Sequence, residues 1–178
     1  PGTFMTESAK VVSVEAIPLK IPFTHGGPSV SWAGSDWQAL EIVLVRLQTD
    51  SGLVGWGEAF SYNCRRAVVA MIEDSAANVL VGKLVSERAQ IMQELQVRMH
   101  LWGRYGISMF AISGIDIALW DLTAKAANQS LGQMLGGNKK KLPAYASLLK
   151  YRDPEVVAEQ TADAIANGYG LIKLHEST

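Results

Sequence analysis

The chain has 178 residues, of which 48% are hydrophobic and 19% charged, so it can bury a sizeable core as one ordinary domain or a small pair. Its formal net charge is −1 and its longest basic run is Lys139–Lys141, which gives no attraction to polyphosphate and argues against a nucleic-acid partner. The single cysteine, Cys64, cannot form an internal disulfide, so we expect a protein of a reducing compartment, the cytoplasm.

The N-terminal third of the chain predicts three β-strands. Met5 resembles a natural start, so Pro1–Phe4 are expected to be an added segment. The strands are apolar runs rich in β-branched residues, and the turn Asp50-Ser51-Gly52 joins the last two. Together they predict an antiparallel meander, with an exposed, irregular loop, Pro22–Asp36, between the first and second strands. The expected strands are Val11–Ile21, Ala39–Gln48 and Leu53–Ala59.

From Cys64 onward the hydrophobic period becomes helical. Apolar residues recur at spacings of three and four in three segments, which predicts three helices packed behind the meander. The third segment is apolar on most sides and is expected to be the central helix. Its window Ile107–Leu122 is interrupted by Asp116 and Asp121 and is too short to span a bilayer, so no membrane partner is expected. The periodic residues are Val68, Ile72, Ala76, Val79 and Leu80; Met92, Leu95, Met99 and Trp102; and Ile112, Ile115, Leu119 and Leu122.

The C-terminal part predicts a strand, a helix and a second strand. Asp153 is a good N-cap and Pro154 suits the first helical position, while Gly168 suits the helix end. This order is typical of a βαβ unit, so the two strands are expected to be parallel and joined by a right-handed connection. The expected segments are a short helix at Ser130–Leu135, the strand Leu142–Leu149, the helix from Asp153 to Asn167 and the strand Leu171–His175.

Two stretches of the sequence carry a family resemblance. The stretch FAISGIDIALWDLTAKAANQSLGQMLGG at Phe110–Gly137, with GLVGWGEA at Gly52–Ala59, closely resembles the mandelate racemase and muconate lactonizing branch of the enolase superfamily. The first stretch is specific evidence for the family because many positions agree in register, whereas the second stretch alone would be weak evidence. The resemblance covers nearly the whole chain from about Val11 onward.

The resemblance implies a two-part organisation. Such enzymes have an α+β capping domain, a three-stranded antiparallel meander plus helices, followed by a (β/α)8 TIM-type barrel that carries the chemistry. Residues 5–138 would be the capping domain and residues 139–178 the first strands of the barrel. Because a complete barrel takes roughly 250 residues, the chain is expected to be the N-terminal part of a longer enzyme, with its barrel truncated.

Lys173 and His175 are the candidate catalytic residues. In such enzymes a barrel strand presents Lys-x-Lys, and this sequence departs from that pattern with Lys173-Leu174-His175. Strand periodicity places Lys173 and His175 on one face. The resemblance implies that Lys173 faces the substrate carboxylate and that His175 replaces the second lysine, the usual base on that face. An imidazole suits proton transfer near neutral pH, although its shorter reach leaves a polar wall or a proton relay as alternatives. Without the resemblance, Lys173 would be a solvent-facing lysine and His175 a histidine satisfied by a neighbour.

The resemblance also implies a reaction. The family removes the proton next to a substrate carboxylate and holds the resulting enolate with Mg²⁺. Its acidic metal ligands lie on later barrel strands, so they are expected beyond Thr178 and the fragment alone is expected to be inactive. A sugar-acid dehydratase is the first expectation and a racemase, epimerase or cycloisomerase the second. A non-catalytic binding or oligomerisation domain is the alternative, and a homo-oligomer is expected.

Two loops are candidate contacts for a small carboxylic acid substrate. His25 and Trp32 lie in the glycine-rich loop that folds over the barrel mouth in similar enzymes, and Tyr62 and Asn63 lie in a second specificity loop. An ordinary exposed loop explains each of these residues equally well.

Four other residues suggest chemistry that we do not expect. Asp116 and Asp121 lie five apart on a helix, on different faces and without a third acid, so they are expected to bind backbone or cationic groups rather than a metal. His100, on an amphipathic helix, is expected to be structural. Cys64 has no histidine nearby in the sequence, so it is not expected to be a nucleophile.

Overall fold

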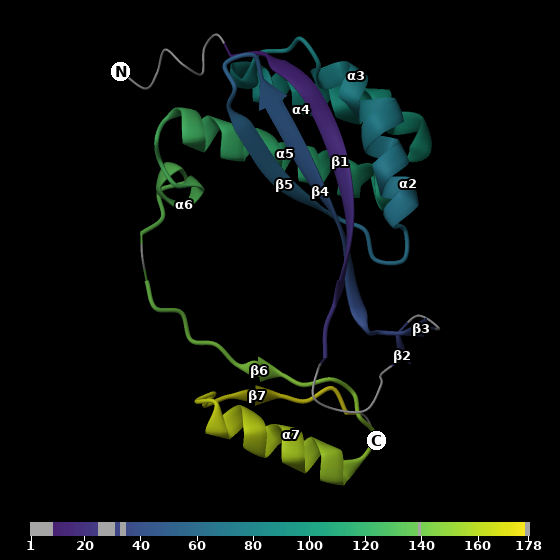
Figure 1. Ribbon diagram of the computed structural model, residues 1–178, viewed down its shortest axis with the longest axis vertical. Helices are drawn as coiled ribbons and strands as arrows, with labels where there is room; N and C mark the ends of the chain where they lie inside the picture. Colours follow the sequence, from purple (N-terminus) through teal and green to yellow (C-terminus); the bar gives the residue numbers. More distant parts are fainter. Residues whose placement is uncertain (1–8, 25–30, 33–34, 139, 177–178) are drawn as a thin grey trace. The chain divides into compact units, whose positions relative to one another are not determined.

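A three-stranded sheet forms one layer of the protein. The computed structural model describes residues 9–24, 31–32, 35–138 and 140–176. Strands β1 (Val11–Pro22), β4 (Ala39–Thr49) and β5 (Val54–Phe60) form this sheet in the order β1-β4-β5 (Figure 1). β4 and β5 are antiparallel, and Thr49 donates its N–H to the carbonyl of Leu53 across the predicted turn. The predicted meander is therefore confirmed, with strand ends close to those expected.

The chain divides into two compact units. The first comprises Pro1–Lys20 and Glu41–Asn138, and the second comprises Ile21–Leu40 and Lys139–Thr178. The sheet and most of the helices belong to the first unit. The segment Ile21–Leu40 groups with the C-terminal segment, which the order of elements in the sequence did not suggest.

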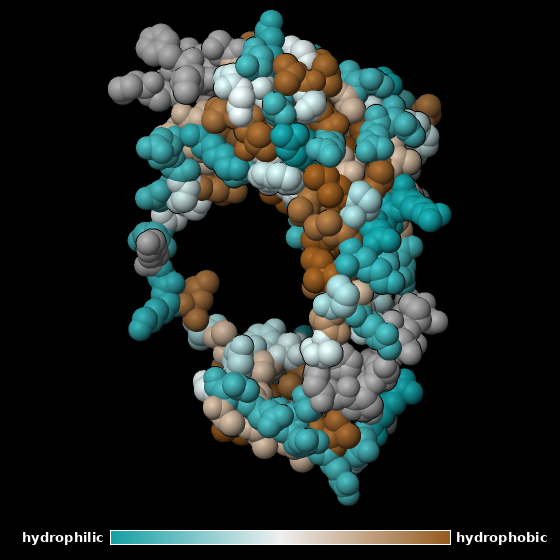
Figure 2. Space-filling model, viewed as in Figure 1, coloured by the Kyte–Doolittle hydropathy of each residue, from teal (hydrophilic) through white to brown (hydrophobic). Residues whose placement is uncertain are grey.

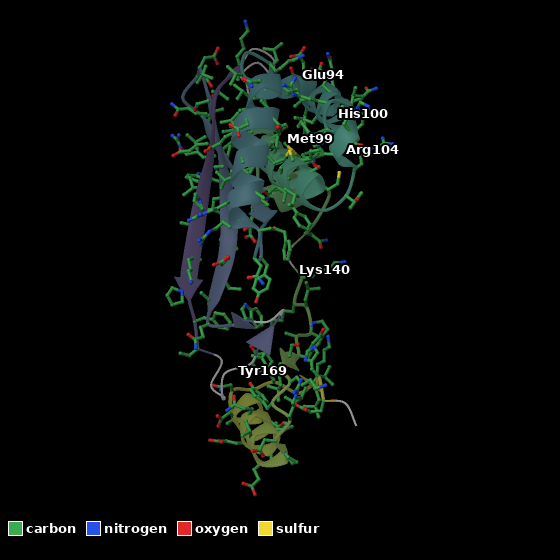
Figure 3. The ribbon with its side chains drawn as sticks, turned by 90° about the vertical axis from the view of Figure 1, so that its right-hand side faces the viewer. Glu94, Met99, His100, Arg104, Lys140 and Tyr169 are labelled. Atoms are coloured by element: carbon green, nitrogen blue, oxygen red, sulfur yellow. The ribbon has the colours of Figure 1, made fainter. Side chains whose placement is uncertain are left out.

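Helices cover one face of the sheet in the first unit, as predicted (Figure 3). The first helical stretch contains a π-helical turn, Met71–Ala76, between α2 (Arg65–Ala70) and α3 (Ala77–Leu80). Apolar spacing cannot reveal such a turn, because it widens the helix by one residue only locally. The remaining helices of this unit are α4 (Arg88–Arg98), α5 (Ile107–Ala126) and α6 (Leu131–Met134), with short 3₁₀ turns at Val85–Glu87 and His100–Trp102.

α5 packs against β5 through glycines. A Cβ atom on Gly57 would lie 2.0 Å from the carbonyl oxygen of Gly114, and one on Gly55 would lie 2.4 Å from that of Ala118. Both distances are far shorter than van der Waals contact, so a larger residue would force the helix away from the strand. The two stretches that carry the family resemblance thus meet as backbone against backbone.

The core of the first unit lies between the sheet and the helices. The predicted central position of α5 is confirmed, since Ile112, Ile115, Leu119 and Leu122 are at most 2% exposed. They pack with fully buried residues of the sheet and of the other helices. These include Val43, Val45, Leu47, Ile72, Leu80, Leu95 and Met99.

The length of α5 corrects one prediction. The helix has 20 residues, longer than the window considered above, so by length and composition alone it could cross a membrane. Half of its apolar window is buried inside the protein, where it packs on β5. A core helix satisfies the same criterion of length and hydropathy, and the packing of α5 identifies it as one.

Among its described residues, the second unit contains two small sheets and one helix. β2 (Ser31–Trp32) and β3 (Ser35–Asp36) pair antiparallel, so the segment predicted to be an irregular loop contains a short hairpin. β6 (Ala146–Ser147) and β7 (Ile172–Lys173) pair in parallel, with helix α7 (Pro154–Ala166) between them in the chain. The predicted parallel βαβ unit is confirmed, but both strands are only two residues long, far shorter than expected.

The signals that start and end α7 act as predicted. The Asp153 side chain accepts a hydrogen bond from the N–H of Glu155, Pro154 occupies the first turn, and Gly168 has a φ of +89° after the last turn. Hydrophobic residues lie at the surface of both units (Figure 2). In the second unit they include Ile165, Leu171 and Leu174, each more than half exposed.

Candidate functional site

Lys173 and His175 lie at the carboxyl end of β7. Lys173 is the last residue of the strand, pairs with Ser147 of β6, and is exposed. His175 lies two residues beyond it, and its Nδ1 is 2.5 Å from the carbonyl oxygen of Leu148, just after β6. The ordered strand ends at Lys173, so strand periodicity no longer governs His175. That the two side chains share a face therefore stays a prediction.

The contact with Leu148 determines which nitrogen of His175 is available. A carbonyl oxygen can only accept a hydrogen bond, so Nδ1 carries the proton and donates it. In the neutral ring Nε2 then holds the free lone pair. The histidine is thus both satisfied by a neighbour, as the simpler prediction stated, and left with one nitrogen able to accept a proton.

Glu176 is a part of this region that the sequence analysis did not identify. Its carboxylate accepts the N–H of Tyr151 at 2.7 Å and the N–H of Arg152 at 3.1 Å. These two residues follow β6, so Glu176 connects the chain after β7 to the chain after β6. The available signal was an acidic residue directly after the Lys-x-His pattern, which by itself says nothing about a partner.

A hollow of about 670 Å³ lies beside these groups in the second unit. Its lining includes Lys150, Arg152, Asp153 and Glu176, together with the apolar side of the first turns of α7. Arg152 has a φ of +63°, in the left-handed region that non-glycine residues seldom adopt. Charged groups of both signs therefore surround a concave surface near the end of β7.

The loop that contains Tyr62 and Asn63 belongs to the first unit. Tyr62 is half-buried, and Asn63 is exposed with a φ of +57° in the turn between β5 and α2. Asparagine tolerates this left-handed conformation better than most residues, which gives Asn63 a structural reason to be there. The nearby Arg65 donates to the carbonyl of Leu19, so this side chain also has a structural partner.

The glycine-rich loop is only partly described. His25 lies outside the described residues. Trp32 lies in β2, and its side chain is likewise outside the described part of the chain. The role predicted for these two residues, like that of Tyr62 and Asn63, stays a prediction.

The two aspartates of α5 bind cations and backbone, as predicted. Asp116 forms an ion pair with Arg88 at 2.7 Å. Asp121 accepts the backbone N–H of Trp56 at 2.8 Å and the ammonium of Lys125 at 2.6 Å. In the part of the chain that the structure describes, no three His, Cys, Asp or Glu residues gather where they could hold a metal ion.

Cys64 and His100 lie in the first unit, where each has its own local environment. Burial raises the pKa of the Cys64 thiol, which makes the reactive thiolate scarcer at neutral pH. His100 is exposed, and its Nδ1 contacts the carbonyl oxygen of Val97 at 2.7 Å, near the C-terminal end of α4 (Figure 3).

Comparison with known proteins identifies the family. The family model described as "Mandelate racemase / muconate lactonizing enzyme, N-terminal domain" matches residues 13–136, which include the whole sheet–helix contact made by the glycines of β5. The chain belongs to this family. The predicted membership in the enolase superfamily and the capping-domain fold are both confirmed.

Two relatives of the family show which reactions it includes. The chain is 34% identical over 142 residues to the arabinonate dehydratase of Saccharolobus solfataricus, a match that covers 76% of this chain and 37% of the relative. It is 32% identical over 136 residues to the 3,6-anhydro-alpha-L-galactonate cycloisomerase of Streptomyces coelicolor, covering 75% and 38% respectively. The chain therefore spans well under half the length of these relatives.

Solved structures of the superfamily have the same fold. A member of the enolase superfamily from Polaromonas sp. JS666 superposes with a TM-score of 0.80 at 33% identity, covering 94% of this chain and 44% of that one. A racemase from Streptomyces coelicolor A3(2), crystallised with bound magnesium, has a TM-score of 0.76 at 28% identity, covering 89% and 44%. Magnesium is thus found in this superfamily.

Proposed function

We propose that this chain is part of an enzyme that removes the proton next to a substrate carboxylate. The observation that carries the proposal is the pair Lys173 and His175 at the carboxyl end of the parallel strand β7, with Nε2 of His175 left free by the bond to Leu148. Family membership supports the same reaction class. The carboxyl ends of barrel strands are where such enzymes place their reacting groups.

The two side chains have different roles in this proposal. The ammonium of Lys173 lies beside the substrate carboxylate and stabilises the negative charge that develops on its oxygens as the proton leaves. Nε2 of His175 accepts that proton, while Nδ1 keeps its own proton on the carbonyl of Leu148. The ring thereby becomes a cation that still donates to Leu148, so the acceptor of Nδ1 does not have to change.

The metal belongs to the whole enzyme in this proposal. When bound, Mg²⁺ would supply positive charge that stabilises the negative charge developing on the substrate carboxylate. The described residues form no cluster that fits such an ion, so no step of this chain is assigned to the metal. We expect the 178-residue chain alone to show no Mg²⁺-dependent turnover of any sugar acid, and turnover by the homogeneous chain would contradict this assignment.

For the substrate, we favour a sugar acid that is dehydrated. Arabinonate dehydratase, a relative at 34% identity, supports this choice. Racemisation, epimerisation or cycloisomerisation of a related acid is the second choice, supported by the cycloisomerase and racemase among the similar proteins. The cytoplasm remains the expected location.

The test is exchange of the substrate α-proton with solvent deuterium, followed by NMR for a panel of carboxylic acids with the complete enzyme. Lys173→Ala should lower the exchange rate by about 10³-fold or more, since it removes a charge that acts mainly in the transition state. Glu159→Ala, which removes an exposed charge on α7, is the matched control and should leave exchange unchanged. Unchanged exchange in Lys173→Ala would remove this lysine from the mechanism.

Assembly of copies is the second proposal, and a surface of the first unit supports it. The segment from the end of α4 toward α5 exposes Val97, Leu101, Trp102 and Tyr105, with Leu101 at 81% and Tyr105 at 78%. Large apolar side chains this exposed are typical of contact surfaces. We expect the protein to form a homo-oligomer. In the double variant Leu101→Ser/Tyr105→Ser, the mass measured by light scattering should fall toward that of a monomer. An unchanged oligomeric mass would place the contact elsewhere.

A further inference from the structure

The geometry at the end of β7 points to a role for Glu176. We propose that Glu176 is a positioning residue, whose carboxylate fixes the chain after β6 so that the carbonyl of Leu148 holds His175 with its proton on Nδ1. The inference rests on the proposed function, in which the free Nε2 of His175 accepts the substrate proton. Glu176 itself contacts backbone and is not assigned a contact with substrate.

Two consecutive residues, His175 and Glu176, both form hydrogen bonds to the segment after β6. His175 reaches the carbonyl of Leu148, and Glu176 reaches the N–H groups of Tyr151 and Arg152. The backbone ladder does not continue that far: it pairs only Ala146 with Ile172 and Ser147 with Lys173. The side chains of His175 and Glu176 therefore replace strand pairing where the strands have ended.

One contact alone would leave the segment free to turn. The backbone of Leu148 is bonded through its N–H to the carbonyl of Lys173, but the residues that follow belong to no strand. The carboxylate of Glu176 fixes the far end of this short segment. With both ends held, the carbonyl of Leu148 keeps a constant direction toward the imidazole.

The conformation of Arg152 supports this role. Its φ of +63° is unfavourable for a residue with a Cβ atom, and it persists where surrounding contacts determine it. A left-handed residue after a turn lets successive N–H groups converge into an anion-binding concavity. Here the N–H groups of Tyr151 and Arg152 converge on the carboxylate of Glu176, which occupies that concavity.

Packing does not hold the imidazole in place. His175 and Glu176 are both exposed, and so are the neighbouring Leu174 and Arg152. An exposed imidazole without a fixed acceptor exchanges its proton between the two nitrogens, whereas a fixed carbonyl at Nδ1 selects one tautomer. The hydrogen bonds described above are therefore what determines the position of the proton.

The test measures the tautomer directly by ¹⁵N NMR of the imidazole nitrogens, in the 178-residue chain labelled at histidine. In the unsubstituted chain Nδ1 of His175 should carry the proton. In Glu176→Ala the signals should shift toward the tautomer mixture of an exposed histidine. A proton on Nε2 in the unsubstituted chain, or the same tautomer in Glu176→Ala, would overturn the proposal.

Three further variants serve as controls. Glu159→Ala removes an equal charge from α7 and should leave the tautomer unchanged. Arg152→Gly keeps both N–H groups and tolerates the positive φ, so it should also keep the Nδ1–H tautomer. If Glu176→Ala fails to fold, Glu176→Gln keeps the side-chain shape and one acceptor oxygen, and it should give a smaller shift in the same direction.

Activity separates this inference from the proposed function. In the complete enzyme, Glu176→Ala should lower α-proton exchange by roughly 10- to 100-fold with little change in KM, by analogy with groups that orient metal-ligating histidines. A shifted tautomer with unchanged exchange would support the positioning role but remove His175 from proton transfer. An unshifted tautomer would overturn the positioning role whatever the exchange rate.

Discussion

The two units of this protein are stabilised in different ways. In the first unit, α5 lies so close to β5 that only glycine fits between their backbones, and the core residues of helix and strand are almost fully buried. In the second unit, two-residue strands are supplemented by side chains that bind backbone groups, while Ile165 and Leu171 are about 60% exposed. The first unit thus depends on packing and the second on a few hydrogen bonds.

This difference indicates where sequence change is tolerated. Packing as dense as that of β5 and α5 resists any gain in volume, because interiors are filled to crystal-like density. Hydrogen bonds between exposed groups cost less to lose and are easier to replace. We therefore expect substitutions to be tolerated better at the end of β7 than in the contact between β5 and α5.

The largest expected effect tests the packed contact. Gly57→Ala would place a Cβ atom 2.0 Å from the carbonyl oxygen of Gly114, so α5 must shift. We expect a loss of about 3 kcal/mol in the free energy of unfolding, at the upper end of overpacking costs. Urea unfolding followed by circular dichroism measures it.

Gly170 in the second unit provides the matched control. A Cβ atom there would meet nothing within 4 Å. Gly170→Ala should therefore change the unfolding free energy by no more than about 0.5 kcal/mol. Equal losses in the two alanine variants would show that the contact between β5 and α5 is not as close as described.

The next effect concerns the free edge of β5. Asp121→Ala leaves the N–H of Trp56 without its carboxylate and Lys125 without its ion pair. We expect a loss of about 1–2 kcal/mol, less than for a buried pair because Asp121 is 27% exposed. Glu58→Ala, an exposed change on the same strand, should be nearly neutral in the same unfolding measurement. A loss as small as that of Glu58→Ala would mean that water replaces the carboxylate.

A smaller effect is expected in the second unit. Asp153→Ala removes the side chain that accepts the N–H of Glu155 at the start of α7. The expected loss is about 1 kcal/mol, the usual contribution of an N-cap. Amide hydrogen exchange of α7 should speed up in Asp153→Ala and not in Asp163→Ala, an exposed aspartate later in the helix. Equal rates in the two variants would argue that the cap contributes nothing.

The smallest expected effect on stability comes from an ion pair between Lys83 and Glu94. The hydrogen bond between Lys83 and Glu94, 2.8 Å long, raises the pKa of the lysine and lowers that of the glutamate. The stability that Glu94 gains from this hydrogen bond is present above the ordinary pKa of 4.5. It is lost as pH falls through the lower pKa of the folded state. The stability that Lys83 gains is present below the ordinary lysine pKa of 10.5. It is lost as pH rises through the higher pKa of the folded state.

The measurement compares the chain with Glu94→Gln across pH. The unsubstituted chain should be slightly more stable than the variant near neutral pH, and the difference should disappear at acid pH. High salt should also reduce it, because both side chains are partly exposed to solvent. A difference that persists in acid would assign the effect to something other than this pair.

Most of the first unit could be predicted from the sequence, because its elements repeat regular patterns. Apolar runs rich in β-branched residues marked the strands, and spacings of three and four marked the helices. The contact between Gly57 and Gly114 could not be predicted, because two glycines far apart in the sequence do not reveal that they meet. The resemblance found these glycines, and the structure gives their physical reason.

Less of the candidate site could be predicted. Lys173 and His175 were identified from a family pattern, but the strands around them are much shorter than the apolar runs suggested. Leu142 was predicted to begin the first of these strands, but it lies outside β6 and is 82% exposed. An apolar run becomes a strand only where it packs against neighbouring structure. Glu176 was missed because its partners are backbone N–H groups, and such groups are identical in every sequence.

One feature of α5 affects how copies of this protein can meet. The register of β4 and β5 turns the N–H of Trp56 and the carbonyl of Val54 outward, and Asp121 and Lys125 occupy these two groups. A polypeptide approaching from that side would find this donor and this acceptor already hydrogen-bonded to α5. Two of the groups that a further strand would pair with are thus occupied, which disfavours growth of the sheet into fibrous aggregates from that edge.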